Sequence, residues 1–172
     1  MTTVVLREDA IHYHARRGLE LLDWRLLAGQ YPNGSDDELP CLSVVDSRLA
    51  RDRSPDPRRH SLNKLVPDLL AVRRNLLMVI EMKPGYNPAD ELKLIELMTT
   101  RRNEFDEAFA RLSTQQNWGL DPADLVFLPC LGFSEGTKYP ARPDFCYLTI
   151  DGSHRMRLIP NGTLEEEMAS DG

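Results

Sequence analysis

The sequence has few cysteines and no long apolar run. Its three cysteines, Cys41, Cys130 and Cys146, are widely spaced, and no pair of them follows the CxxC pattern of a zinc site. Each stands in an apolar stretch, so we expect buried free thiols in a reducing compartment. No apolar stretch approaches the roughly 20 residues of a membrane-spanning helix, and the N-terminal residues lack the pattern of a secretory signal. These absences predict a cytoplasmic protein that does not contact a membrane.

An excess of positive charge is also absent. The 172 residues include 21 lysines and arginines against 27 aspartates and glutamates, for a formal net charge of -6. This balance excludes a wholly basic surface, although nucleic-acid binding depends on the local potential. Basic residues are concentrated in two places: Arg48, Arg51, Arg53, Arg58, Arg59 and Lys64, and Arg101 with Arg102. A solvated basic loop would have the same composition, so charge alone leaves nucleic-acid binding open.

Apolar periodicity predicts one α/β domain over residues 1–172, with a core of about 7–160 and a frayed acidic tail of about 163–172. Because the central strands are apolar on both faces, helices should cover both sides of the sheet. The expected fold is therefore α/β, a mixed sheet flanked by helices with a C-terminal β-hairpin. The expected elements are helices over 7–29 and 88–113, strands over 41–49, 65–72, 76–83 and 124–133, and a hairpin over 144–160 that turns at Asp151-Gly152.

Two neighbouring strands carry acidic residues within otherwise apolar sequence. Pro-Asp occurs three times and Glu-x-Lys twice, so these letters alone mean little. Asp68 and Glu81 differ from the other occurrences, because both lie inside apolar strands that are adjacent in the sequence. If the chain turns on Arg74 and Asn75, Asp68 faces Glu81 with Cβ atoms about 4.5–5.5 Å apart, and strand alternation puts Lys83 on the same face. The opposite face, buried under a helix, should hold Leu69, Ala71, Met78 and Ile80.

Two opposed carboxylates repel each other unless a cation lies between them. Mg²⁺ prefers hard oxygen ligands, typically one or two carboxylates with several waters. Such an ion can polarise a phosphodiester and lower the pKa of an attacking water. Lys83 would orient or deprotonate that water and stabilise developing negative charge. The alternative is a partly buried salt link, in which Lys83 simply bridges Asp68 and Glu81.

The segment VPDLLAVRRNLLMVIEMK resembles the core motif of the PD-(D/E)xK phosphodiesterase superfamily, the restriction-endonuclease-like nucleases. The resemblance implies an α-β-β-β-α-β core and catalytic roles for Asp68, Glu81 and Lys83. It also implies a Mg²⁺ or Mn²⁺ ion held by Asp68, Glu81 and the backbone carbonyl of Met82. The implied activity is phosphodiester hydrolysis, most simply by a DNA endonuclease of restriction, phage defence, repair or transposition. Cutting both strands would require a homodimer or a larger nuclease complex.

Some residues and one rival function stay open. Many members of the superfamily add a glutamate from the first helix, and both Glu8 and Glu20 are candidates. His12 and His14 are two residues apart and point to different helix faces, so we do not expect them to share a metal. We interpret Tyr13 as a packing group. The rival function is a non-catalytic nucleic-acid-binding or assembly subunit that retains the nuclease fold.

Overall fold

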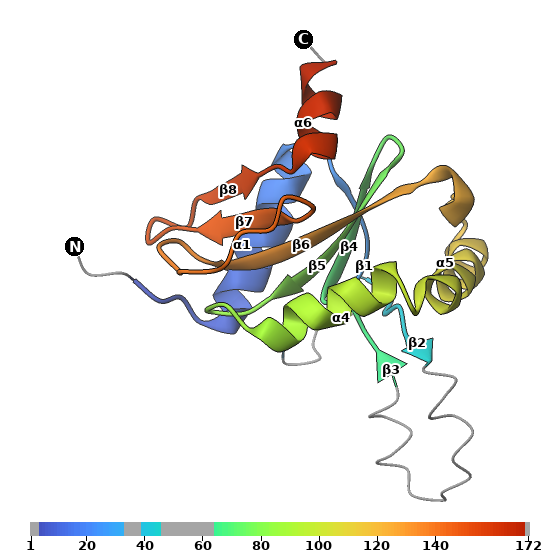
Figure 1. Cartoon of the computed structure of the whole chain (residues 1–172), viewed down its shortest axis with the longest axis horizontal. Helices are drawn as coiled ribbons and strands as arrows, with labels where there is room; N and C mark the ends of the chain where they lie inside the picture. The colour runs from blue at the N-terminus through green and yellow to red at the C-terminus, as the bar shows by residue number, and fades with distance from the viewer. Residues whose placement is uncertain (1–3, 33–38, 46–63, 171–172) are drawn as a thin grey trace, which may run out of the picture.

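A six-stranded mixed sheet forms the centre of the protein (Figure 1). The structure, a computed structural model, describes residues 4–32, 39–45 and 64–170. The strands of the sheet, in their spatial order, are β1 (Arg25–Gly29), β4 (Leu69–Arg73), β5 (Leu76–Met82), β6 (Val126–Ser134), β7 (Cys146–Ile150) and β8 (Met156–Ile159). β1, β4 and β5 are antiparallel neighbours, β5, β6 and β7 are parallel, and β8 is antiparallel to β7. β2 (Val44–Val45) and β3 (Lys64–Leu65) form a separate antiparallel ladder.

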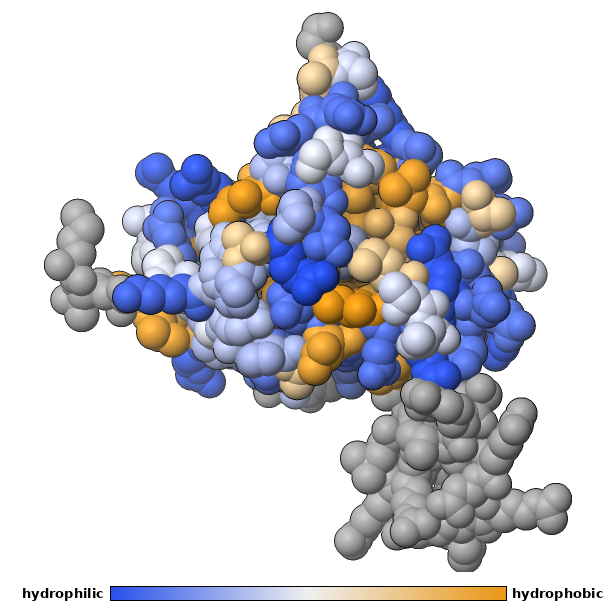
Figure 2. All heavy atoms as spheres, in the orientation of Figure 1, coloured by the Kyte–Doolittle hydropathy of each residue, from blue (hydrophilic) through white to orange (hydrophobic). Residues whose placement is uncertain are grey.

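Helices cover both faces of the sheet. α1 (Glu8–Leu21) packs on one face, and α4 (Pro88–Met98) and α5 (Arg102–Gln116) cover the other (Figure 1). A buried apolar cluster fills each of the two layers between helix and sheet. The surface that carries α4 shows apolar residues in several patches among hydrophilic ones (Figure 2). The predicted α/β architecture, a mixed sheet flanked by helices, is confirmed.

The β4–β5 hairpin has the predicted register. Leu70 pairs with Val79 and Leu69 with Ile80, so the chain turns on Arg74 and Asn75. Arg74 adopts a φ of 55°, the left-handed conformation that such a tight turn requires. The residues expected under a helix lie beneath α1 and are fully buried: Leu69, Ala71, Met78 and Ile80. The predicted register of residues 69–80 and the predicted buried face under α1 are confirmed.

The first predicted helix is too long, and the first predicted strand can be compared only in part, because residues 46–49 lie outside the described ranges. α1 ends at Leu21, and Asp23 turns the chain with a φ of 65°. After Trp24, the five residues Arg25–Gly29 form β1, which pairs with β4. Leu22 and Leu26 fit a helical period, but hydrogen bonding to β4 decides the conformation of β1. Of the strand predicted over 41–49, the described part contributes Val44–Val45 to the small ladder rather than to the main sheet.

The second predicted helix consists of two helices. α4 begins at Pro88, where the Asn87 side chain accepts a hydrogen bond from the Ala89 N–H. It ends at Met98, and the Arg101 N–H turns back to the Glu96 carbonyl before α5 starts. The apolar stripe that suggested one helix continues across this break, because both helices bury their apolar residues on the same face of the sheet.

The C-terminal region contains the predicted hairpin, followed by a helix in place of a frayed tail. β7 and β8 are antiparallel, and the five residues 151–155 connect them instead of a two-residue turn. α6 (Gly162–Ala169) starts at Asn161, whose side chain accepts a hydrogen bond from the Leu164 N–H. Leu164 is fully buried in the apolar cluster on the α1 side, and this contact holds the acidic helix on the domain.

Other sequence predictions have mixed outcomes. Cys130 and Cys146 are buried free thiols as expected, whereas Cys41 is exposed. The arginines of the first basic segment, at 48, 51, 53, 58 and 59, lie outside the described residues. Over the described ranges, no helix combines the length and apolar character needed to cross a membrane.

Gly18 allows α1 to lie directly against β8. A Cβ atom at Gly18 would be 2.7 Å from the Cβ and 2.6 Å from the Sδ of Met156. We expect Gly18→Ala to lower stability by about 1 kcal/mol. Overpacking costs about 1–3 kcal/mol, while alanine in place of glycine in a helix returns about 0.5–1 kcal/mol. Thermal unfolding measures the change, with Gly162→Ala as the control because a Cβ there meets nothing within 4 Å. A melting temperature unchanged in Gly18→Ala would contradict the close approach.

Candidate active site at the end of the central hairpin

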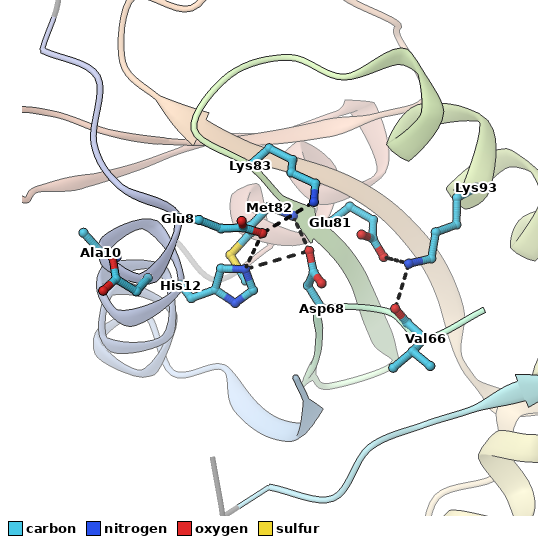
Figure 3. A network of polar contacts seen from close by, with 10 residues as sticks. Glu8, Ala10, His12, Val66, Asp68, Glu81, Met82, Lys83 and Lys93 are labelled. Atoms are coloured by element: carbon cyan, nitrogen blue, oxygen red, sulfur yellow. Dashed lines mark hydrogen bonds and ion pairs between the residues drawn. The ribbon is translucent and has the colours of Figure 1, made fainter. Parts of the chain in front are cut away.

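The two predicted carboxylates lie together at the open end of the β4–β5 hairpin. Asp68 directly precedes β4, and its Oδ2 accepts a hydrogen bond of 2.8 Å from the Met82 N–H. Glu81 lies on β5 and points to the same space (Figure 3). The Glu81 side chain is 3% exposed and that of Asp68 is 16% exposed. The structure therefore brings together the acidic pair that the register predicted.

Glu81 holds its proton unusually tightly. Burial raises the pKa of this carboxyl, the nearby Asp68 carboxylate raises it further, and Lys93 lowers it, with a net value of about 8. Near neutral pH and without a bound cation, the acidic pair therefore keeps a proton. A divalent cation that replaced this proton would remove both the repulsion and part of the desolvation cost.

Lys93, rather than Lys83, is the cation next to Glu81. Its Nζ is 2.7 Å from the Glu81 Oε1 and donates a hydrogen bond of 2.7 Å to the Val66 carbonyl (Figure 3). The predicted salt-link alternative was therefore assigned to the wrong lysine. The sequence places Lys93 in the first turns of the helix predicted over 88–113, where charged residues are common. Lys93 precedes the buried Leu97 by four residues, and this helical spacing indicates that Lys93 lies beside the buried face of α4.

Lys83 lies at the same end of the sheet but contacts the first helix. Its Nζ is 3.5 Å from the Glu8 Oε1. Burial lowers the pKa of Lys83, but the carboxylates of Glu8, Asp90 and Asp68 outweigh it, so that this pKa is raised above its ordinary value. Lys83 is therefore a cation at neutral pH in the metal-free protein. This charge suits the predicted stabilisation of developing negative charge, and deprotonation of the water by Lys83 stays a prediction.

The first helix contributes Glu8 and His12 to the site. Glu8 contacts Lys83, whereas Glu20 is exposed further along α1, so the structure selects Glu8 of the two candidates. The His12 side chain is 1% exposed, and its Nε2 is 3.9 Å from both the Glu8 Oε1 and the Asp68 Oδ2. Sequence reasoning missed His12. Its place one turn after Glu8, on the apolar face with Ala15, was the available signal.

His12 is a neutral, shielded ring beside these carboxylates. Burial lowers its pKa below the usual value, although Asp68 and Glu8 oppose the change. A hydrogen bond with the backbone of Met82, whose carbonyl is a predicted metal ligand, also opposes the lowering of this pKa. This contact is weak, because neither ring nitrogen has a hydrogen-bond partner of normal geometry among the described residues. A nitrogen lone pair directed to this space adds a donor that suits a bound cation or water.

The Arg16 guanidinium group provides a positive charge near the Asp68 carboxylate. The Arg16 side chain is buried, and its Cζ lies 4.2 Å from the centre of the Tyr31 ring. A Cβ atom on Gly29 would be 2.5 Å from the Arg16 Nη2 and 3.2 Å from the Asp68 carbonyl oxygen. Glycine at this position of β1 therefore makes room for the guanidinium group, which places a positive charge near the Asp68 carboxylate.

The site has more carboxylates than cations. Besides Asp68, Glu81 and Glu8, it includes Asp90, whose pKa is raised by burial and then by Asp68 and Glu8. Lys83 and Lys93 oppose this negative charge and lower the pKa of Asp90. An excess of oxygen donors in a partly buried place favours binding of a hard divalent cation.

The donor set fits an ion that keeps several waters, not one enclosed by side chains. No group of three or more His, Cys, Asp or Glu side chains in the described part of the chain is arranged to hold a metal ion. Mg²⁺ commonly takes one or two carboxylates and completes its coordination with water and substrate oxygens. Asp68, Glu81 and the Met82 carbonyl can supply that number of ligands.

Comparison of the chain with models of protein families, with curated proteins and with solved structures finds no match.

Proposed function

We propose that the chain is a divalent-metal-dependent nuclease of the PD-(D/E)xK type, which hydrolyses phosphodiester bonds in DNA. The observation that carries the proposal is the buried Asp68–Glu81 pair, in which Glu81 has a pKa of about 8. Two acids forced together at the open end of a hairpin, beside the Lys83 ammonium, cost stability unless they bind a cation.

The order of elements supports this proposal. α1 is followed by the antiparallel strands β1, β4 and β5, then by α4 and α5, and then by β6. This succession supports the α-β-β-β-α-β core that the sequence resemblance implies, if the β2–β3 ladder is taken as an insertion between β1 and β4. The acidic pair lies where β4 and β5 approach the N-terminal turns of α1 and α4 (Figure 3).

In this mechanism Asp68, Glu81 and the Met82 carbonyl would hold Mg²⁺ or Mn²⁺. When bound, such an ion polarises the scissile phosphodiester and lowers the pKa of the attacking water. The Met82 N–H fixes Asp68, and the Lys93 ammonium fixes Glu81 at 2.7 Å. Lys83, protonated and turned toward Glu8, supplies the positive charge that stabilises the negative charge developing on the phosphate.

One observation favours the rival function, a nucleic-acid-binding or assembly subunit without catalysis. The Lys93 Nζ lies 2.7 Å from the Glu81 Oε1, so the protein itself supplies a cation next to the acidic pair. Incubation of plasmid DNA with the purified protein in Mg²⁺ and in EDTA separates the two functions. Nicked or linear plasmid in Mg²⁺ alone supports the nuclease, and intact plasmid under both conditions supports the binding subunit. Double-strand cutting that rises steeply with protein concentration would support the proposed dimer or larger complex.

Glu8 and Glu20 provide a matched pair of variants on one helix. We expect Glu8→Gln to reduce Mg²⁺-dependent cleavage at least about tenfold, a loss of about 1.4 kcal/mol in transition-state stabilisation. The physical reason is that Glu8 holds the Lys83 ammonium at 3.5 Å and contributes negative charge near the proposed ion. Glu20→Gln removes the same charge from an exposed position and should leave the cleavage rate unchanged. Equal cleavage rates in Glu8→Gln and Glu20→Gln would show that Glu8 has no role in cleavage.

A further inference from the structure

An open groove runs between the outer side of α1 and the end of the β7–β8 hairpin. α1 passes behind β7 and β8 in Figure 1 and contacts both strands. The groove has a volume of about 750 Å³ and is lined by Tyr13, His14, Arg17, Gly18, Leu21, Leu22, His154, Arg155 and Met156. None of the acidic residues of the candidate active site is part of it. Gly18 and Met156, which lie in close contact, are both part of its lining.

The charge of the groove is opposite to that of the whole chain. Arg17 and Arg155 provide two full positive charges, and no lining residue is acidic. The sequence as a whole has a net charge of -6. The pKa of His14 is lowered by burial and then by the positive charges of His154 and Arg17, so these groups repel one another. An anion bound between them would relieve this repulsion.

Exposed aromatic rings stand among these cations. Tyr13 is 47% exposed, and the Arg17 Cζ lies 5.8 Å from the centre of its ring. The rings of His14 and His154 stack with centroids 4.3 Å apart and planes at 15°. Exposed aromatic faces beside cations are the arrangement that binds unpaired bases and their phosphates, because any base can stack on such a face.

The turn that carries His154 is held in one conformation. The Asp151 carboxylate accepts hydrogen bonds from the N–H groups of Ser153 and Arg155, and the Asp151 carbonyl accepts one from the His154 N–H. His154 itself has a φ of 64°, which is uncommon for a residue with a side chain. The loop thus presents an imidazole ring and a guanidinium group to the groove at a cost in backbone strain.

We propose that this groove binds a segment of single-stranded DNA, with phosphates at Arg17 and Arg155 and a base stacked on Tyr13 or on the histidine pair. The inference rests on the proposed nuclease function, because α1 carries both Glu8 at the site and Arg17 in the groove. Arg17 is nine positions after Glu8, which is about 14 Å along the helix axis and about two and a half turns around it. A strand leaving the site would therefore pass around α1 to enter the groove. Stacking requires unpaired bases, so a duplex of the same length should bind the groove poorly.

Fluorescence anisotropy with a labelled oligothymidylate, in EDTA so that no cleavage takes place, tests the inference. Arg17→Ser and Arg155→Ser should each weaken binding several-fold, and together they should reduce the salt slope by about 1.4, because two phosphate contacts are lost. Tyr13→Leu should weaken binding at least about fivefold if its ring stacks on a base. Arg111→Ser on α5 is the matched control, since Arg111 is equally a surface arginine but lies on the opposite side of the sheet. It should bind like the wild-type protein.

Three results would overturn the inference. They are unchanged binding in the Arg17 and Arg155 variants, an equal loss in Arg111→Ser, and displacement of the probe by oligoglutamate as readily as by unlabelled oligothymidylate. The groove and the nuclease can fail separately. Cleavage of plasmid by a protein whose groove variants bind normally would overturn only the groove. Loss of binding in those variants, with no cleavage by the wild-type protein in Mg²⁺, would overturn only the nuclease.

Discussion

Asp68→Asn and Glu81→Gln are each expected to reduce Mg²⁺-dependent plasmid cleavage by at least about a thousandfold, the scale of losing a charged group that stabilises a transition state. Each substitution keeps the size of the side chain but replaces a negatively charged ligand of the proposed ion with a neutral one. Because the two carboxylates repel each other, neither variant should unfold. Cleavage assays in Mg²⁺ and thermal unfolding in EDTA measure the two effects.

The chain supplies its own controls for this experiment. Asp144 also follows a proline and is 44% exposed, and Glu91 also precedes a lysine by two residues. Asp144→Asn and Glu91→Gln therefore repeat the two substitutions in the same local sequence but away from the buried pair. Both should cleave at the wild-type rate. Full activity in Asp68→Asn or in Glu81→Gln would refute the proposed site.

The metal-free protein is expected to lose stability as the pH rises from about 5 to 8. The pKa of Glu81 is raised in the folded state to about 8, so over this range the folded protein binds a proton that the unfolded chain releases. The free energy of unfolding is then highest below the pKa of Glu81 in the unfolded chain. It falls as the pH rises through this interval and levels off above the pKa of Glu81 in the folded protein. Glu81→Gln has no such proton and should lack this part of the slope.

Thermal unfolding in EDTA at several pH values measures this effect. At pH 8 we expect Glu81→Gln to be more stable than the wild-type protein by about 1–2 kcal/mol, which is about 2–8 °C in melting temperature for a domain of this size. Added Mg²⁺ should raise the melting temperature of the wild-type protein at pH 8 more than that of Glu81→Gln, because the ion replaces the proton. The same pH slope in both proteins would show that Glu81 titrates normally.

The sequence predicted the part of the site that depends on local geometry. Strand alternation and a two-residue turn determine which residues of β4 and β5 share a face, so Asp68 and Glu81 could be paired without coordinates. Lys93 and His12 could not be predicted in this way. Each comes from a helix whose distance and rotation relative to the sheet depend on packing of many apolar side chains. The same limit explains why β1 was taken for the end of a helix.

Two of the ion pairs at the site connect the sheet to helices on opposite faces. Glu81 is tied to Lys93 of α4, and Lys83 to Glu8 of α1. The distance between these pairs is therefore set by the thickness of both apolar layers, and not by the hairpin alone. A substitution deep in either core that moves its helix by a fraction of an ångström changes the charge balance around Asp68. Under the proposed function, variants that repack either layer should therefore alter ion affinity before they alter the fold.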